Sequence, residues 1–264
     1  MNMRNPSKDG LAAGEAVEQP STRFALAGMR RRAVSRPWLI SVLQRGDGPR
    51  VSHLTGLYLI AALGGFVDAA CFLGLGHVFA EMMTGNLLLF CIYLGTGDHI
   101  FWHGGYLLAL ASFALGAVSA GRILRSTRGH TRLGFAIEWV FLALAVALSM
   151  TLPLDANPSA ALFVLAPLAF AFGVQNALLR KHGVPDLATN VMTLTFAAYV
   201  ADSRVAGGHN EQRRRRLGSI GLFMTGATLG AVLTKTFGPW AALMMGLIVF
   251  TVALTGLTRQ KLPA

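Results

Sequence analysis

Apolar segments about 20 residues long recur from residue 54 to the end of the chain, and they limit its fold more than any other feature. An α-helix of about 20 residues spans the hydrocarbon core of a bilayer, which is about 30 Å thick. The segments lie approximately at 54–74, 78–97, 104–121, 134–152, 160–179, 187–201, 217–235 and 239–257. They predict an all-α fold, a polytopic transmembrane helix bundle that occupies residues 51–258.

Composition and charge agree with a membrane protein. Only 13% of the residues are charged and 53% are hydrophobic, whereas a soluble domain has about 25% charged residues. The net charge of +11 is the difference between 23 Lys and Arg and 12 Asp and Glu. The basic residues lie mostly in loops and tails, where cytoplasmic segments of membrane proteins collect them. We therefore expect a lipid bilayer as the surroundings and no nucleic acid as a partner. A basic cytoplasmic tail at 1–50, predicted to be disordered, and a short C-terminal tail at 259–264 flank the membrane domain.

A polar motif occurs twice inside the apolar sequence. Asp68 is followed after 16 residues by Thr84, and Asn176 is followed after 17 residues by Thr193. The copies read Gly65-Phe66-Val67-Asp68-Ala69 with Met83-Thr84-Gly85-Asn86, and Gly173-Val174-Gln175-Asn176-Ala177 with Met192-Thr193-Leu194-Thr195. The duplication predicts two four-segment repeats, at 54–152 and 160–257.

Two of the segments, 78–97 and 187–201, are interrupted by polar residues and are predicted to be broken or re-entrant. Irregular backbone at membrane depth is tolerated only where protein or a wet cavity satisfies it. If both segments enter and leave on one face, every basic loop except the one holding Lys235 lies in the cytoplasm, as the distribution of Lys and Arg in membrane proteins requires. We therefore favour six crossings over seven or eight, with inverted repeats and with both termini on the cytoplasmic side of a bacterial inner membrane.

Inverted repeats with discontinuous helices are typical of secondary transporters, whose sites lie near the middle of the bilayer. Polar residues inside membrane segments are costly and mark sites or pathways. The strongest candidate is Asp68, which shares a helix face with Ala61, Gly64 and Gly65. The candidates for a substrate or ion pathway are Asp68, Thr84, Gly85, Asn86, Gln175, Asn176, Thr189, Asn190 and Thr193.

Each candidate also has a purely structural interpretation. Asp68 could cap a helix end or pair with another buried polar group. Gln175 and Asn176 could hydrogen-bond one helix to another. The Thr and Asn residues of the two interrupted segments could belong to ordinary helices with polar packing.

Small residues predict close helix packing. Gly116-Ala117-Val118 aligns with Gly230-Ala231-Val232, and at the same offset Ser112 aligns with Gly226. Such faces could also join two copies of the chain, so a homo-oligomer is an alternative that the pattern leaves open. The predicted packing residues are Gly64, Gly65, Gly116, Gly173, Gly226 and Gly230.

Other reactive side chains are assigned no role by the sequence. Glu81 and Glu138 lie near predicted membrane edges and are expected to be solvated there. Asp98, His99 and His103 have metal-like spacing but lie at a membrane edge, so we expect no metal site. Cys71 and Cys91 lie in apolar segments and are expected to be small buried hydrophobic residues. No enzyme or cofactor motif occurs, and we expect neither catalysis nor a cofactor.

The stretch Gly65–Asn86, with Gly173–Ala177 and Asp186–Thr193, resembles the YoaK-type domain-of-unknown-function family of bacterial membrane proteins. The resemblance covers about residues 52–258. It implies a multi-pass inner-membrane protein of unassigned activity, and it says nothing of the basic tail or of a substrate.

Two functions remain compatible with these patterns. The first is a small secondary transporter or exporter of a polar solute or ion. The second is a membrane binding, assembly or sensory protein that transports nothing and in which the basic tail is the active part.

Overall fold

Helices make up the regular structure of the membrane domain. The computed structural model describes residues 51–97, 103–126, 131–154, 157, 159–182, 192–209 and 211–258. Within these ranges no strand occurs, which confirms the all-helical prediction. A helix satisfies its own backbone hydrogen bonds, as lipid requires. The helices are α2 (Val51–Gly74), α3 (Met83–Thr96), α4 (His103–Ser126), α5 (Thr131–Thr151), α6 (Ala160–His182), α7 (Met192–Ala201), η2 (Arg204–Ala206), α8 (Arg213–Phe237) and α9 (Pro239–Thr258).

Five of these helices, α2, α4, α5, α6 and α8, are long and apolar enough to cross a membrane. The apolar parts of α3, α7 and α9 are shorter. With 14 residues, α3 is about 21 Å long, and with 10 residues α7 is about 15 Å long. Both are shorter than the hydrocarbon core, and they lie in the two segments whose sequence is interrupted by polar residues.

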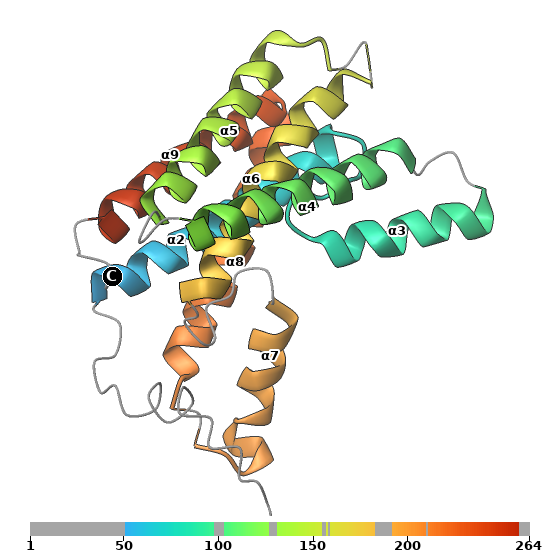
Figure 1. The fold of residues 1–264 in the computed structure, drawn as a ribbon. Coiled ribbons are helices and arrows are strands. Elements are labelled where there is room, and N and C mark those ends of the chain that lie inside the picture. The colour runs from blue at the N-terminus through green and yellow to red at the C-terminus, as the bar shows by residue number, and fades with distance from the viewer. Residues whose placement is uncertain are drawn as a thin grey trace, which may run out of the picture. The chain divides into compact units, whose positions relative to one another are not determined.

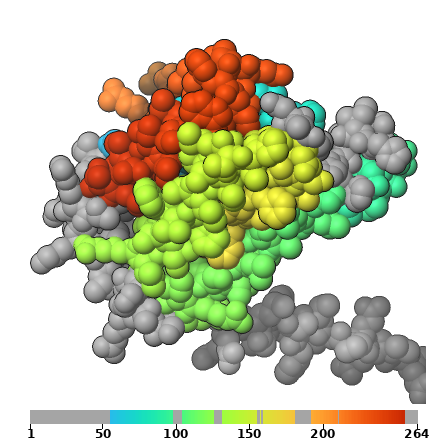
Figure 2. Space-filling model, turned by 90° about the horizontal axis from the view of Figure 1, so that it is seen from above, coloured from blue at the N-terminus to red at the C-terminus, as the bar shows by residue number. Residues whose placement is uncertain are grey.

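The first helix of each half of the chain packs mainly against helices of the other half. The first helix of one half, α2, packs chiefly against α8 and α9 of the other half, whereas α6 packs chiefly against α4 and α5. The helices α5 and α9 lie side by side and join the two groups (Figure 2). The short helix α3 packs on α4, and α7 packs on α8 (Figure 1).

Glycines let two of these helix pairs cross at backbone contact. A Cβ on Gly65 of α2 would fall on the backbone oxygen of Phe223 in α8, and one on Gly173 of α6 would fall on that of Phe113 in α4. A side chain at either position would therefore force the helices apart.

The reciprocal contacts define which residues of the two crossings correspond. Gly116 faces the backbone of Phe170, and Gly226 faces the backbone of Ala62. By these contacts Gly116 corresponds to Gly226. The sequence aligned Gly116 with Gly230 instead, which is one helical turn further along α8. Gly230 lies at the next turn, against Phe66.

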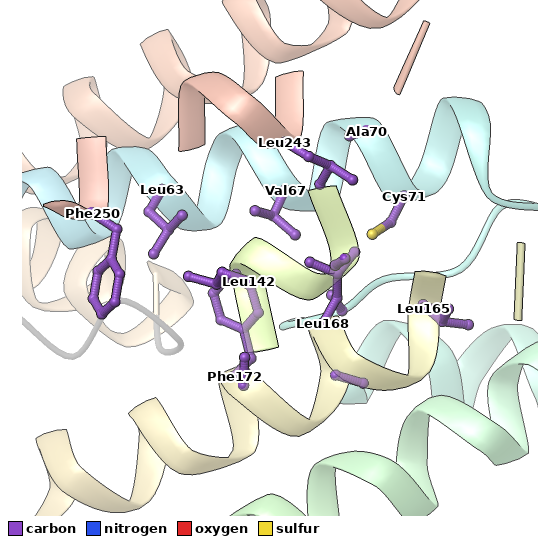
Figure 3. Close-up of a cluster of buried hydrophobic side chains, with 14 of the residues drawn as sticks. Leu63, Val67, Ala70, Cys71, Leu142, Leu165, Leu168, Phe172, Leu243 and Phe250 are labelled. Atoms are coloured by element: carbon purple, nitrogen blue, oxygen red, sulfur yellow. The ribbon is translucent and has the colours of Figure 1, made fainter. Parts of the chain in front are cut away.

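Apolar side chains from α2, α5, α6 and α9 meet between the two crossings. Figure 3 shows Leu142 of α5 among Val67 of α2 and Leu168 of α6, with Phe250 of α9 nearby. These side chains are almost completely buried. Because Glu138 lies one turn before Leu142, this packing carries a carboxyl group to the edge of the core.

After α2 the chain turns back along the helix that it has just left. Gly76 and His77 have positive φ angles of 92° and 61°, and such consecutive left-handed residues reverse the chain. The ring of Phe79 then stacks on that of Phe72, with centroids 5.1 Å apart. We call residues 75–82 the return segment. The sequence predicted an apolar segment from residue 78, but the helix begins only at Met83, because Asp68 takes up the amides that precede it.

Candidate functional site

The return segment is held by the carboxylate of Asp68. The backbone amides of Ala80 and Glu81 both donate hydrogen bonds to Asp68 Oδ1, each at 2.9 Å. Asp68 lies in α2, six residues before Gly74, which is about 9 Å along the helix axis. The side chain therefore brings the chain back to membrane depth, and its second oxygen, Oδ2, is buried with no hydrogen-bond partner among the described residues.

Asn86 holds the same segment from the other side. Its Oδ1 accepts a hydrogen bond from the amide of Phe79 at 2.9 Å, and its Nδ2 donates to the carbonyl of Phe79 at 2.8 Å. The amide side chain of Asn86 thus pairs with both backbone groups of one residue, as a neighbouring strand would. A Cβ on Gly85 would lie 3.0 Å from the ring of Phe79, so the first turn of α3 lies tightly against the return segment.

The return segment carries Glu81 into the interior. Only 4% of Glu81 is exposed. A Cβ on Gly64 would fall on Glu81 Oε2 and lie 3.1 Å from Cδ. The absence of a side chain at Gly64 is therefore what makes room for this carboxyl group, one turn of α2 away from Asp68.

Glu138 approaches Glu81 from α5. It is 1% exposed, and neither of its carboxyl oxygens has a hydrogen-bond partner within the described ranges. The two carboxyl groups are close enough for the charge of Glu81 to act on Glu138. The expectation that Glu81 and Glu138 are solvated at membrane edges is therefore wrong, because the return segment and the packing of α5 bury both.

Gln175 belongs to the same part of the interior. It is completely buried, and neither its Oε1 nor its Nε2 has a hydrogen-bond partner in the described part of the chain. Gly134 of α5 packs against Leu178 of α6. The short connection after α5 makes α5 and α6 antiparallel. Glu138 lies one turn after Gly134 on α5, and Gln175 lies one turn before Leu178 on α6, so Glu138 and Gln175 lie at the same level.

Asp68, Glu81 and Glu138, which we call the acid cluster, therefore come from α2, the return segment and α5. The basic residue among the buried side chains that the structure describes is Arg216. Its Nη1 bonds to Asp202 Oδ2 at 2.6 Å and to the carbonyl of Ala198 at 2.8 Å, which ties α8 to the end of α7. Arg216 is thus engaged with Asp202 and Ala198.

The remaining candidates lie elsewhere or cannot be placed. Asn176 donates from Nδ2 to the carbonyl of Phe172 at 2.9 Å within its own helix. Thr84 and Thr193 are exposed on α3 and α7. Thr189 and Asn190 lie outside the described residues, as do Asp98 and His99 and the side chain of His103. The described residues contain no group of three or more His, Cys, Asp or Glu that could hold a metal ion.

Sequence reasoning identified Asp68 but missed its two acidic neighbours. A signal for Glu138 was present: Gly134, Glu138 and Leu142 recur at intervals of four and therefore share one helix face, which packs inward. No comparable signal existed for Glu81, because its burial depends on the non-helical path of the return segment.

Comparisons with known proteins give a family. The model of the family described as "Protein of unknown function (DUF1275)" matches residues 56–255. The UPF0700 transmembrane protein YoaK of Bacillus subtilis (strain 168) is 26% identical over 151 residues, which make up 56% of this chain. The alignment covers 66% of that protein, just under two thirds of its length. No solved structure matches the chain.

Proposed function

This chain belongs to the DUF1275 family of proteins of unknown function, and from that premise we propose that its membrane domain is a small secondary transporter or exporter of a polar solute or ion. The family match and the similarity to a transmembrane protein confirm the resemblance drawn from the two motifs. With the apolar helices, they make the chain a multi-pass integral membrane protein.

One observation carries the proposal: three carboxyl groups lie buried among helices long enough to span a bilayer, and Glu138 has no hydrogen-bond partner among the described residues. Ionisable groups inside a membrane protein are costly and by default mark a substrate or ion path. A protein that only assembled with others would have little use for an unsatisfied acid in its interior.

The way in which the helices pack also supports the proposal. The α2–α8 and α6–α4 crossings have the same pattern of contacts, as two repeats exchanged by a pseudo-two-fold axis would have. In this architecture α3 and α7 are re-entrant, six helices cross, and the repeats have opposite orientations. The termini and the basic loops then lie in the cytoplasm of a bacterial inner membrane.

The return segment supplies the discontinuity that transporter sites use. At the level of Gly64, Glu81 lies about 15 Å below the end of α2, which is half of the hydrocarbon thickness. Polar groups at that depth meet the path of a solute that passes between the two halves.

Transport can be tested with the purified full chain in liposomes. Uptake of a panel containing sodium, potassium, methylammonium, succinate and glycine would be compared in liposomes with and without protein. We expect at least one compound to enter faster with the wild-type chain, with the increase lost in Glu138→Gln and kept in the exposed control Glu211→Gln. Uptake equal to that of empty liposomes for the whole panel would contradict transport and favour a binding or sensory protein. Protein-dependent uptake that is unchanged in Glu138→Gln would contradict the role of the buried acids in it.

A further inference from the structure

Arginines gather where α7, η2 and α8 meet. Residues 202–216 contain five arginines and two acidic residues, Asp202 and Glu211. The arginines are Arg204 in η2 and Arg213, Arg214, Arg215 and Arg216 in the first turn of α8. Arg216 is buried and bonds both to Asp202 and to the carbonyl of Ala198. These bonds fix the end of α7 and the start of η2 against the first turn of α8.

Three of the arginines are exposed beside one another, and we call Arg204, Arg213 and Arg214 the arginine patch. The ion pair between Asp202 and Arg216 brings them together. Arg204 follows Asp202 by two residues, and Arg213 precedes Arg216 by about one helical turn. Because Asp202 is paired with the buried arginine, its charge is directed away from the patch, which therefore presents net positive charge at the surface.

The first turn of α8 does not balance this charge itself. It contains no acidic residue, and its N-cap, Gln212, makes no side-chain capping bond. The exposed acid beside it is Glu211, one carboxylate against the arginine patch. Positive side chains at the positive end of a helix dipole disfavour one another. An anion bound to the arginine patch would relieve that repulsion.

Apolar side chains lie exposed next to the arginine patch. Val205 directly follows Arg204 and is 99% exposed. On α7, Leu194, Phe196 and Val200 are also exposed. With 10 residues, α7 is about 15 Å long, which is the hydrocarbon thickness of one leaflet, half of about 30 Å. The surface therefore has positive charge at one end of α7 and apolar side chains along its length.

We propose that the arginine patch and the exposed face of α7 bind an anionic phospholipid. The headgroup phosphate accepts hydrogen bonds from the guanidinium groups, whose parallel N–H donors match phosphate oxygens. An acyl chain lies along the apolar side chains of α7. Basic clusters next to a transmembrane helix attract anionic headgroups. A nucleic acid or an acidic peptide would satisfy the arginines but leave the apolar face uncovered, so the two halves of the surface together fit an amphiphile.

This inference goes beyond the proposed function, because the lipid site would exist whether or not the domain transports a solute. It also differs from a general attraction of basic residues to a membrane. Arg122 and Arg125 form another exposed pair, in the last turns of α4. They lie at the carbonyl end of a helix, which already favours cations. They therefore provide a control with the same charge in a different setting.

Native mass spectrometry of the purified full chain measures the lipids that it retains. The chain in a non-ionic detergent would be titrated with dioleoyl phosphatidylglycerol, which is anionic, or with dioleoyl phosphatidylcholine, which has no net charge. We expect the wild-type chain to bind phosphatidylglycerol about tenfold more tightly than phosphatidylcholine. Arg204→Gln should lower that preference about fivefold, and Arg213→Gln combined with Arg214→Gln should remove most of it.

The matched control is Arg122→Gln combined with Arg125→Gln, which removes the same charge and should leave the preference unchanged. Arg204→Gln lies outside α8, so it tests the arginine patch even if the double variant at the start of α8 does not fold. Equal binding of the two lipids by the wild-type chain, or an equal loss of preference in the two double variants, would overturn the site.

The acyl chain can be tested separately from the phosphate. Glycerol 1-phosphate carries the phosphate without acyl chains, and at the same concentration it should not displace phosphatidylglycerol. Displacement by glycerol 1-phosphate would show a site for free phosphate and would overturn the lipid proposal.

Discussion

Two helix crossings in this protein are built alike and serve different chemistry. Gly65 lets α2 touch α8, Gly173 lets α6 touch α4, and three residues after each glycine comes a polar residue, Asp68 or Asn176. Asp68 reaches out of its helix to the return segment, whereas a bond of Asn176 goes to its own helix, at Phe172. The glycines therefore fix the scaffold in both halves, while the carboxylate of Asp68 holds the return segment that carries Glu81 inward.

The largest effects should come from closing the space at the two crossings. A Cβ at Gly65 or Gly173 falls on backbone that cannot move aside, so Gly65→Ala and Gly173→Ala should each lower the free energy of unfolding by about 3 kcal/mol. Gly221→Ala, whose Cβ meets open space, should change it by less than about 0.5 kcal/mol. Unfolding in a mixed-micelle denaturant titration measures all three. A large loss at one crossing and none at the other would break the comparison.

The next largest loss of stability should be that of Asp68→Ala, and it should exceed the loss in Asn176→Ala. Asp68→Ala leaves the buried amides of Ala80 and Glu81 without their acceptor, which should cost about 2–3 kcal/mol. Asn176→Ala should cost about 1 kcal/mol. The same titration measures both, and amide hydrogen exchange should show faster exchange at residues 80 and 81 in Asp68→Ala alone. Equal costs would mean that the two polar residues have the same role.

Asn86→Ala tests the second attachment of the return segment. The variant removes the partner of both backbone groups of Phe79 and should lower stability by about 1–2 kcal/mol. The exposed neighbour Thr84 provides the matched control, since Thr84→Ala should change stability by less than about 0.5 kcal/mol. Thermal unfolding followed by size-exclusion chromatography distinguishes them, and an equal loss in both would show that Asn86 does not act through Phe79.

The smallest effect should come from the ion pair that ties α8 to the end of α7. Asp202 is half exposed, so Asp202→Asn, which weakens its ion pair with Arg216, should lower stability by less than about 1 kcal/mol. Hydrogen exchange in α7 should nevertheless rise, because Arg216 also bonds to the carbonyl of Ala198 near the end of that helix. Unchanged exchange in α7 would mean that the ion pair does not hold the helix in place.

The sequence predicted the features that depend on local pattern. The eight apolar segments correspond to the eight α-helices described, and the segments interrupted by polar residues contain α3 and α7. Asp68 stood out because a carboxylate in an apolar helix is rare. These conclusions need only composition and periodicity.

The acid cluster could not be predicted because it depends on tertiary structure. Glu81 is buried by a reversal at Gly76 and His77 and by the space at Gly64. Glu138 lies only seven residues into its helix, so its position in sequence suggested an exposed edge. The alignment of Gly116 with Gly230 differed by one turn from the observed contacts, because small residues at both Gly226 and Gly230 fit the same spacing.

In this fold the chain turns back after α2 and carries Glu81 into the interior beside Gly64. Comparing the two ends of that path tests the reversal. Single cysteines at Leu73 and Thr96, which are exposed near the ends of α2 and α3, would be introduced into a chain with Cys71 and Cys91 replaced by Ser. Cells would be treated with a membrane-impermeant maleimide before and after permeabilisation. The account predicts that both cysteines react under the same condition, because the return segment and α3 bring the chain back to the face where α2 ends. Reaction of one cysteine in intact cells and of the other only after permeabilisation would show that this segment crosses the membrane, and would contradict the account.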